Sequence, residues 1–135
     1  MRDIPIDSFA ILGAAVAKMV IGALWYSPLL FLKAWLELSG VTESQMKRGM
    51  ARALAVDAVG SFIMAYVFFH AIRYAEATTA LQGMALGFWN WAGFVAVVTI
   101  GTVTYEGKPF QLFLLNNGYL LVSLLTMGAI LAEAR

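Results

Sequence analysis

Four long apolar stretches constrain the fold of this 135-residue chain more than any other feature. They cover approximately residues 8–27, 53–74, 81–104 and 110–132. An α-helix needs about 20 such residues to cross the hydrocarbon core of a bilayer, and each stretch is long enough. In lipid a helix satisfies its own backbone hydrogen bonds. The sequence therefore predicts an all-α integral membrane four-helix bundle, formed by a single transmembrane domain over residues 1–135.

The composition agrees with this prediction. Hydrophobic residues make up 61% of the chain and charged residues 13%, whereas soluble domains have about 45–50% and about 25%. A soluble globule of this size could not bury so much apolar surface, so we expect the lipid bilayer to be the main partner. The net charge is only +1, which argues against a nucleic-acid partner because such proteins carry strongly basic surfaces.

Residues for metal, redox or catalytic chemistry are scarce. The chain has no cysteine and one histidine, which excludes disulfides and thiolate metal sites and argues against a histidine-built metal site. It also lacks a nucleophile–base pair, a phosphate-binding glycine loop and a cofactor motif. We therefore predict no catalytic residue, no metal and no cofactor.

The connection between the first two stretches predicts a further helix over residues 28–39. Pro28 suits the first position of a helix with Ser27 as its cap, and Gly40 suits the end. The aromatic side chain of Trp35 is typical of the membrane–water boundary, so this amphipathic helix should lie in the interface. The capping-box pattern that begins at Thr42 predicts that the second spanning helix starts near residue 43, in water.

The distribution of basic residues predicts the orientation. Five lie in the first and third connections, namely Lys33, Lys47, Arg48, Arg52 and Lys108, and three lie on the opposite side, namely Arg2, Arg73 and Arg135. Cytoplasmic loops are enriched in Lys and Arg. We therefore expect a multi-pass membrane protein with both termini outside the cytoplasm.

Lys18 is the most unusual residue of the predicted spans, because a charged side chain at membrane depth is costly unless it is paired or hydrated. One interpretation is a side chain that snorkels toward the interface. The other is a partner inside the bundle, for which Asp57 in the second span is the best candidate. Such a pair could serve a function or only maintain packing.

A candidate polar intramembrane site follows from these residues together with Asn116, Asn117 and Glu106 in and just before the fourth span. Two adjacent amides cannot share one helix face, so at least one should bond a neighbouring helix or a cavity. We expect Asp57, Asn116 and the Glu106 turn at similar depth, in the half that carries the basic residues, with Lys18 deeper in the same half. A hydrogen-bonded structural core is the alternative interpretation.

The third span carries a helix-packing face made of Gly83, Gly87 and Asn90. The small-x-x-x-small spacing lets another helix approach closely, and the amide can hydrogen-bond a neighbour. This face also offers a contact between copies of the chain, and we expect a homo-oligomer.

Several segments together resemble a bacterial integral membrane family catalogued as domain of unknown function 1761. They are the runs from Gly22 to Phe31 (which contains Trp-Tyr-Ser-Pro) and on to Trp35, Gly87-Phe88-Trp89, Tyr105-Glu106-Gly107-Lys108-Pro109, Leu112-Phe113, Asn117-Gly118-Tyr119 and Met127-Gly128-Ala129-Ile130. The resemblance implies four spans and a location in the bacterial cytoplasmic membrane. It implies no activity and no catalytic residues.

The sequence is compatible with three functions. The first is binding or transport of a small solute or lipid by an oligomer, because four short spans enclose little volume alone. The second is a structural or accessory membrane subunit without a ligand. The third is a membrane enzyme acting on a lipid or quinone, with Glu106 or Asp57 as acid–base group.

Overall fold

Each of the four apolar stretches forms a helix, or a run of helical segments, long enough to cross a bilayer. The structure, a computed structural model, describes residues 5–134, which form helices and turns and contain no strand. The elements are α1 (Ser8–Trp25), α2 (Leu32–Ser39), α3 (Glu43–Tyr74), α4 (Ala80–Asn90), the π-helix η1 (Trp91–Ala96), α5 (Val97–Thr99), α6 (Gly101–Thr104) and α7 (Phe110–Glu133). The predicted all-α architecture with four spans is confirmed. Arg2 and Arg135 of the charge count lie outside the described residues.

Side-chain caps explain where three of the four spans begin. Asp7 Oδ1 accepts a hydrogen bond from the Ala10 backbone nitrogen at 3.0 Å and caps α1. Thr42 forms the predicted capping box at the start of α3, and Thr79 forms a second one at the start of α4. These caps satisfy backbone N–H groups that have no partner within the helix.

The helix between the first two spans is shorter than predicted. It begins at Leu32 and not at Pro28, because the backbone from residue 27 to residue 31 folds into a turn. In that turn the Phe31 nitrogen donates to the Trp25 carbonyl at 3.0 Å. The end of the helix is as predicted, since Gly40 adopts a left-handed φ of 76°.

The third span is also less regular than the single helix predicted over residues 81–104. Its middle, from Trp91 to Ala96, is a π-helix, and two short helical pieces complete the crossing. Wide turns of this kind occur mostly as local insertions in α-helices. Here the π-helix begins at Trp91 and ends shortly before Thr99, and both of these residues hydrogen-bond to Asn117 of α7.

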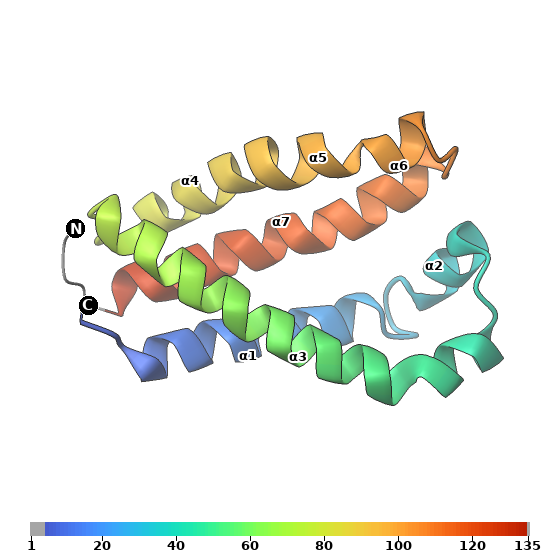
Figure 1. Cartoon of the computed structure of the whole chain (residues 1–135), viewed down its shortest axis with the longest axis horizontal. Helices are drawn as coiled ribbons and strands as arrows, with labels where there is room; N and C mark the ends of the chain where they lie inside the picture. The colour runs from blue at the N-terminus through green and yellow to red at the C-terminus, as the bar shows by residue number, and fades with distance from the viewer. Residues whose placement is uncertain (1–4, 135) are drawn as a thin grey trace.

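The helix α7 is the centre of the bundle. It packs against α4, α1 and α3, and α1 also packs against α3. Figure 1 shows the third span running along α7, with α3 crossing in front. The starts of α1 and α4 and the ends of α3 and α7 lie at one end of the bundle, whereas α2 lies at the other, beside the start of α3.

The predicted glycine face is buried within one copy of the chain. A Cβ atom on Gly83 would clash with the carbonyl oxygen of Gly128, and one on Gly87 would clash with that of Leu124. The face therefore allows close packing of α4 on α7. The expectation that it is free to contact another copy is wrong, because α7 already covers it.

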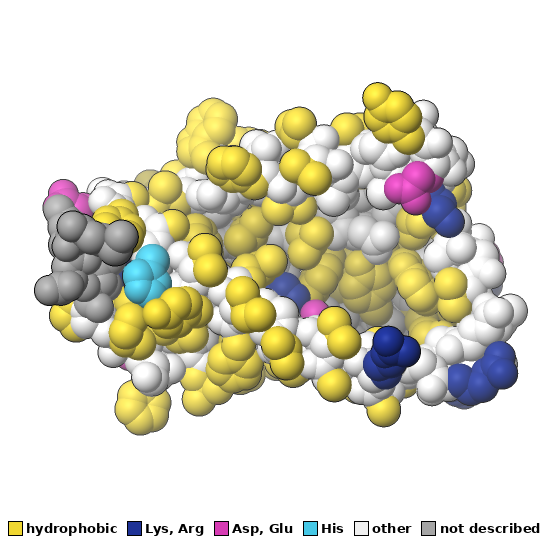
Figure 2. Space-filling view, in the orientation of Figure 1, with side chains coloured by type: hydrophobic (Ala, Val, Ile, Leu, Met, Phe, Trp, Pro, Cys, Tyr) yellow, Lys and Arg dark blue, Asp and Glu magenta, His cyan; other side chains and the backbone are white. Residues whose placement is uncertain are grey.

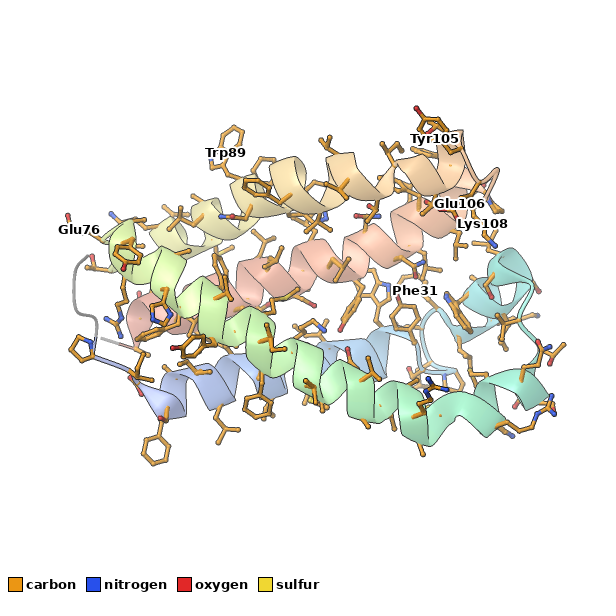
Figure 3. All side chains as sticks on the ribbon, viewed as in Figure 1. Phe31, Glu76, Trp89, Tyr105, Glu106 and Lys108 are labelled. Atoms are coloured by element: carbon orange, nitrogen blue, oxygen red, sulfur yellow. The ribbon has the colours of Figure 1, made fainter. Side chains whose placement is uncertain are left out.

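Apolar side chains cover much of the outer surface (Figure 2). Large hydrophobic residues are exposed along every span, for example Phe9, Val59, Trp89 and Val122. Figure 3 shows Trp89 pointing outward from the third span. Such a surface is suited to the hydrocarbon interior of a bilayer and not to water.

Candidate functional site

Lys18 lies inside the bundle and donates three hydrogen bonds. Its Nζ atom is 3.1 Å from Asp57 Oδ1, 3.0 Å from Ser61 Oγ and 3.0 Å from the Tyr119 hydroxyl. The ammonium group also lies 5.3 Å from the centre of the Tyr119 ring. Only 5% of Lys18 is exposed, so the partner inside the bundle is observed and the snorkelling interpretation is wrong.

The local sequence explains how three helices bring these groups together. Ala14 and Ala15 of α1 are fully buried, and such small side chains let α1 approach its neighbours closely. On α3, Asp57 and Ser61 are four residues apart and therefore lie on one face, one turn from each other. Tyr119 reaches the same point from α7.

A second polar layer continues from this cluster toward the end of the bundle that holds α2. Tyr26, which directly follows α1, packs edge-to-face on Tyr119 with ring centres 5.4 Å apart. Its hydroxyl donates to Asn116 Oδ1 at 2.7 Å. Nearby, Trp25 Nε1 donates to the Leu115 carbonyl at 3.0 Å. These contacts attach the end of α1 to α7.

A crevice of about 490 Å³ adjoins the polar cluster. It is lined by Met19, Gly22, Ala23, Tyr26, Met50, Ala53, Leu54, Asp57 and Tyr119. Lys18 is not part of the lining, whereas the Asp57 side chain is 41% exposed. The wall of the crevice thus presents a carboxylate and two tyrosines, with the cation behind them.

A second cavity, of about 500 Å³, lies between α2 and the start of α3. Its lining is Tyr26, Pro28, Leu32, Trp35, Met46 and Met50. Tyr26 and Met50 belong to both linings, so the two cavities are neighbours. Figure 2 shows that this face of the molecule is hollowed and mainly apolar, with a basic and an acidic side chain visible next to each other inside the hollow. The hollow can accept an apolar body next to a few polar groups.

The structure divides the other predicted site residues between different places. Asn117 is buried but turns away from the cluster: its Oδ1 accepts from Thr99 Oγ1 at 3.2 Å, and its carbonyl accepts from Trp91 Nε1 at 2.9 Å. The adjacent amides thus serve different neighbours, as their position on a helix requires. The Asn90 amide donates to the Leu86 carbonyl of its own helix at 2.8 Å, and within residues 5–134 no hydrogen bond joins Asn90 to a neighbouring helix.

Glu106 is separate from the candidate site. It lies in the exposed turn between α6 and α7, and Figure 3 shows it beside Lys108 at the end of the bundle. The expectation that Glu106 shares the depth of Asp57 is wrong. The two short helical pieces that end the third span carry the turn beyond the level of the polar cluster.

Sequence reasoning missed three participants, Ser61, Tyr26 and Tyr119, as partners of the cluster. Ser61 carried a usable signal, because it follows Asp57 by one helical turn. The tyrosines carried none, since their hydroxyls could equally have faced the membrane boundary, where tyrosine is common. Their role depends on how α1 and α7 are rotated against each other.

The polar cluster can bind, orient and hold a proton, but it does not resemble a metal centre. Among residues 5–134, no group of three or more His, Cys, Asp or Glu side chains could hold a metal ion. No curated protein and no solved structure is significantly similar to the chain. The model of one family, described as a protein of unknown function (DUF1761), matches residues 9–132. Since this match covers nearly the whole sequence, the chain belongs to the DUF1761 family.

Proposed function

We propose that this protein binds a small lipid-like molecule inside the membrane, in the crevice beside Asp57. The observation that carries the proposal is the exposure of a carboxylate on the wall of a cavity in a membrane-spanning bundle. A charged side chain in this setting is costly unless a polar group or water meets it. Here Lys18 is buried and Asp57 is 41% exposed.

The shape and chemistry of the two cavities support an amphiphilic ligand. The crevice of about 490 Å³ lies within the range of small-molecule sites in general, which is about 300–1,000 Å³. Such sites combine a mainly apolar lining with few polar groups. The neighbouring apolar cavity beside α2 would extend the space for a hydrocarbon chain. Both lie within one copy of the chain, so the proposal does not require an oligomer.

A structural role is the second candidate, and one observation favours it. Lys18 connects α1, α3 and α7 through three hydrogen bonds and is thereby fully satisfied. An accessory subunit without a ligand could use this cluster only to determine which helices pack together. The two candidates differ in what they predict for the crevice, which has no role in the structural one.

An enzyme acting on a lipid or quinone finds less support. That function would use Asp57 or Glu106 as acid–base group. Glu106 lies in an exposed turn at the end of the bundle, whereas Asp57 lines the crevice. Asp57 also forms an ion pair with Lys18, which stabilises its charged form and makes it a hydrogen-bond acceptor for a ligand.

The orientation in the membrane forms part of the proposal. Among the described residues, the end of the bundle that holds α2 carries Lys33, Lys47, Arg48, Arg52 and Lys108, and the opposite end carries Arg73. Basic side chains are visible at the α2 end in Figure 2. The rule that cytoplasmic segments are basic favours this end on the inside of a bacterial cytoplasmic membrane. The crevice would then be nearer the cytoplasmic leaflet.

Native mass spectrometry of the protein extracted gently from its membrane tests the proposal. We expect a co-purifying amphiphile on the unmodified chain. Leu54→Trp should remove it, because Leu54 lines the crevice and a larger side chain would fill the space. Val98→Trp is the matched control, since Val98 is 70% exposed on the third span and away from the crevice.

Two results would contradict the proposal. One is an unmodified chain that carries no amphiphile and takes up none when lipids are added back. The other is equal loading of the Leu54→Trp and Val98→Trp variants, which would mean that bound lipid sits elsewhere. Either result would favour the structural role of the polar cluster.

A further inference from the structure

We infer that the ligand of this crevice is a neutral amphiphile whose polar end donates a hydrogen bond, such as a long-chain alcohol. The inference rests on the proposed function and adds the chemical class of the ligand. It follows from the hydrogen-bonding capacity that remains on the wall once the bonds within the protein have been counted.

The polar atoms on the wall are left mainly as acceptors. Asp57 accepts one hydrogen bond from Lys18 through Oδ1, and no other bond to its carboxylate is observed among the described residues. The Tyr26 hydroxyl gives its proton to Asn116 at 2.7 Å, so its oxygen can only accept from a ligand. The Tyr119 hydroxyl accepts from Lys18 at 3.0 Å, and its own proton has only a long contact, of 3.5 Å, with the Lys18 carbonyl.

The strongest donor of the site is not available to a ligand. An ammonium group has three N–H donors, and those of Lys18 are directed to Asp57, Ser61 and Tyr119. Lys18 is also absent from the lining of the crevice. A ligand that only accepts hydrogen bonds, such as a quinone or an ester carbonyl, would therefore find only the weakly engaged Tyr119 hydroxyl as a side-chain donor on the crevice wall.

The charge of the site favours a neutral ligand. Lys18 and Asp57 form an ion pair with no net charge. An anionic head would meet the Asp57 carboxylate first, with the cation behind it. A cationic head would add a second positive charge to a carboxylate that Lys18 already neutralises. In a medium of low dielectric constant both arrangements are unfavourable, whereas a hydroxyl group adds no charge.

The rest of the lining suits a hydrocarbon chain. Beside the three polar residues, the crevice is lined by methionine, alanine, leucine and glycine. The neighbouring cavity adds Leu32, Trp35 and Met46. Methionine side chains adapt readily to different apolar shapes. The site therefore selects its ligand mainly by the polar head group, and it can accept hydrocarbon chains of different shapes.

Four probes that have the same twelve-carbon chain and differ only in the polar head group test the inference. Dodecanol, dodecyl methyl ether, dodecanoate and dodecylammonium are added separately, at neutral pH, to the full chain in amphipol, and bound probe is measured by native mass spectrometry. We expect dodecanol to bind about tenfold or more tightly than each of the others, which is the gain from one hydrogen bond to a charged acceptor. The ether is the closest control, because it keeps an oxygen but has no O–H.

Only binding that is abolished by Leu54→Trp counts as binding in the crevice. If dodecanoate, dodecylammonium or the ether bound there as tightly as dodecanol, the inference would be wrong while the proposed function would stand. If no probe bound there, the proposed function itself would fail. The comparison among probes uses the unmodified chain, so it does not depend on whether a variant folds.

Asp57→Asn provides a second readout. The amide adds a donor to the wall and removes the negative charge, so the preference for dodecanol over the ether should fall to about threefold or less, since a neutral hydrogen bond is weaker. Circular dichroism establishes whether this variant is folded before the probes are added. A folded Asp57→Asn protein that kept the full preference would overturn the assignment of Asp57 as the acceptor.

Discussion

Lys18 Nζ donates a 3.0 Å hydrogen bond to the hydroxyl of Tyr119, a residue 101 positions further along the chain. The same ammonium group lies 5.3 Å from the centre of the Tyr119 ring. The contact attaches α1 to the central helix α7, and Asp57 and Ser61 attach α3 to the same point. Three of the four spans thus meet at one buried cation, and its removal should be felt throughout the bundle.

Lys18→Met should destabilise the protein by roughly 1–3 kcal/mol, because it leaves Asp57 without its cation and two hydroxyls without their donor. The lower part of that range is expected, since the Asp57 side chain is 41% exposed. Equilibrium unfolding in mixed micelles of dodecyl sulfate and a mild detergent measures the change. Lys47→Met is the matched control: Lys47 pairs with Glu43 on the surface at 3.2 Å, and such a pair contributes about 0.3–0.5 kcal/mol. Equal losses in the two variants would contradict the central role of Lys18.

Tyr26→Phe should cost about 0.5–1.5 kcal/mol, because Asn116 Oδ1 loses the hydroxyl that donates to it at 2.7 Å. The ring itself is kept, so its packing on Tyr119 should persist. The same unfolding measurement applies. Tyr105→Phe serves as control, since Tyr105 is 93% exposed and Figure 3 shows it at the end of the third span. A cost for Tyr105→Phe as large as that for Tyr26→Phe would show that hydroxyl loss is not specific to this contact.

Gly87→Ala should separate α4 from α7 and cost roughly 1–3 kcal/mol, because the added methyl group would overlap the backbone of Leu124. Gly60→Ala on α3 makes the same chemical change where the new atom meets nothing within 4 Å. That variant should be neutral or stabilised by up to about 1 kcal/mol, since alanine favours helix. The difference in unfolding free energy between the two variants is the quantity to measure. A tolerated Gly87→Ala would mean that the helices are less closely packed than described.

Thr99→Val should weaken the contact between the third span and α7 by about 0.5 kcal/mol, because Asn117 Oδ1 loses a 3.2 Å hydrogen bond from a hydroxyl whose single proton it shares with the Val95 carbonyl at 2.7 Å. Valine keeps the shape of threonine, so packing changes little. Thr104→Val is the control, since the Thr104 hydroxyl donates to the Ile100 carbonyl within its own span at 3.4 Å and to no residue of another span among residues 5–134. We expect the free energy of unfolding to fall more for Thr99→Val than for Thr104→Val. The reverse order would contradict the role given to Asn117.

The proposed orientation predicts a labelling pattern. The chain has no cysteine, so a single introduced thiol is the only one present. Thr78→Cys, in the exposed connection before α4, should react with a membrane-impermeant maleimide added to intact spheroplasts. Ser44→Cys, at the start of α3, should react only after the membrane is opened. The opposite pattern would invert the orientation and place the crevice near the outer leaflet.

The spans, the Thr42 capping box and the glycine face could be predicted from the sequence because each depends on neighbouring residues. Hydropathy over about 20 positions is a local property of the sequence, so it predicts a span whatever the arrangement of the helices. Thr42 with Gln45 forms a capping box within a single turn. The resemblance to the family was likewise carried by short motifs, and the family match over residues 9–132 confirms it.

The composition of the polar site depended on the rotation of one helix against another. Adjacent amides on α7, Asn116 and Asn117, point to different neighbours, and the sequence does not state which neighbour each one meets. Glu106 was misplaced because the irregular end of the third span decides how far its turn lies from Asp57.

The sequence by itself determined that this chain has four helices long and apolar enough to cross a membrane, with a charged residue in the first of them that requires a partner. The tertiary structure alone decided which groups satisfy that residue, and that Asp57 faces a crevice while Lys18 does not. The physical reason is the range of the interactions. Helix formation in lipid depends on the backbone and on local apolarity, whereas a three-way hydrogen-bonded cluster exists only after helices distant in sequence have packed at specific angles.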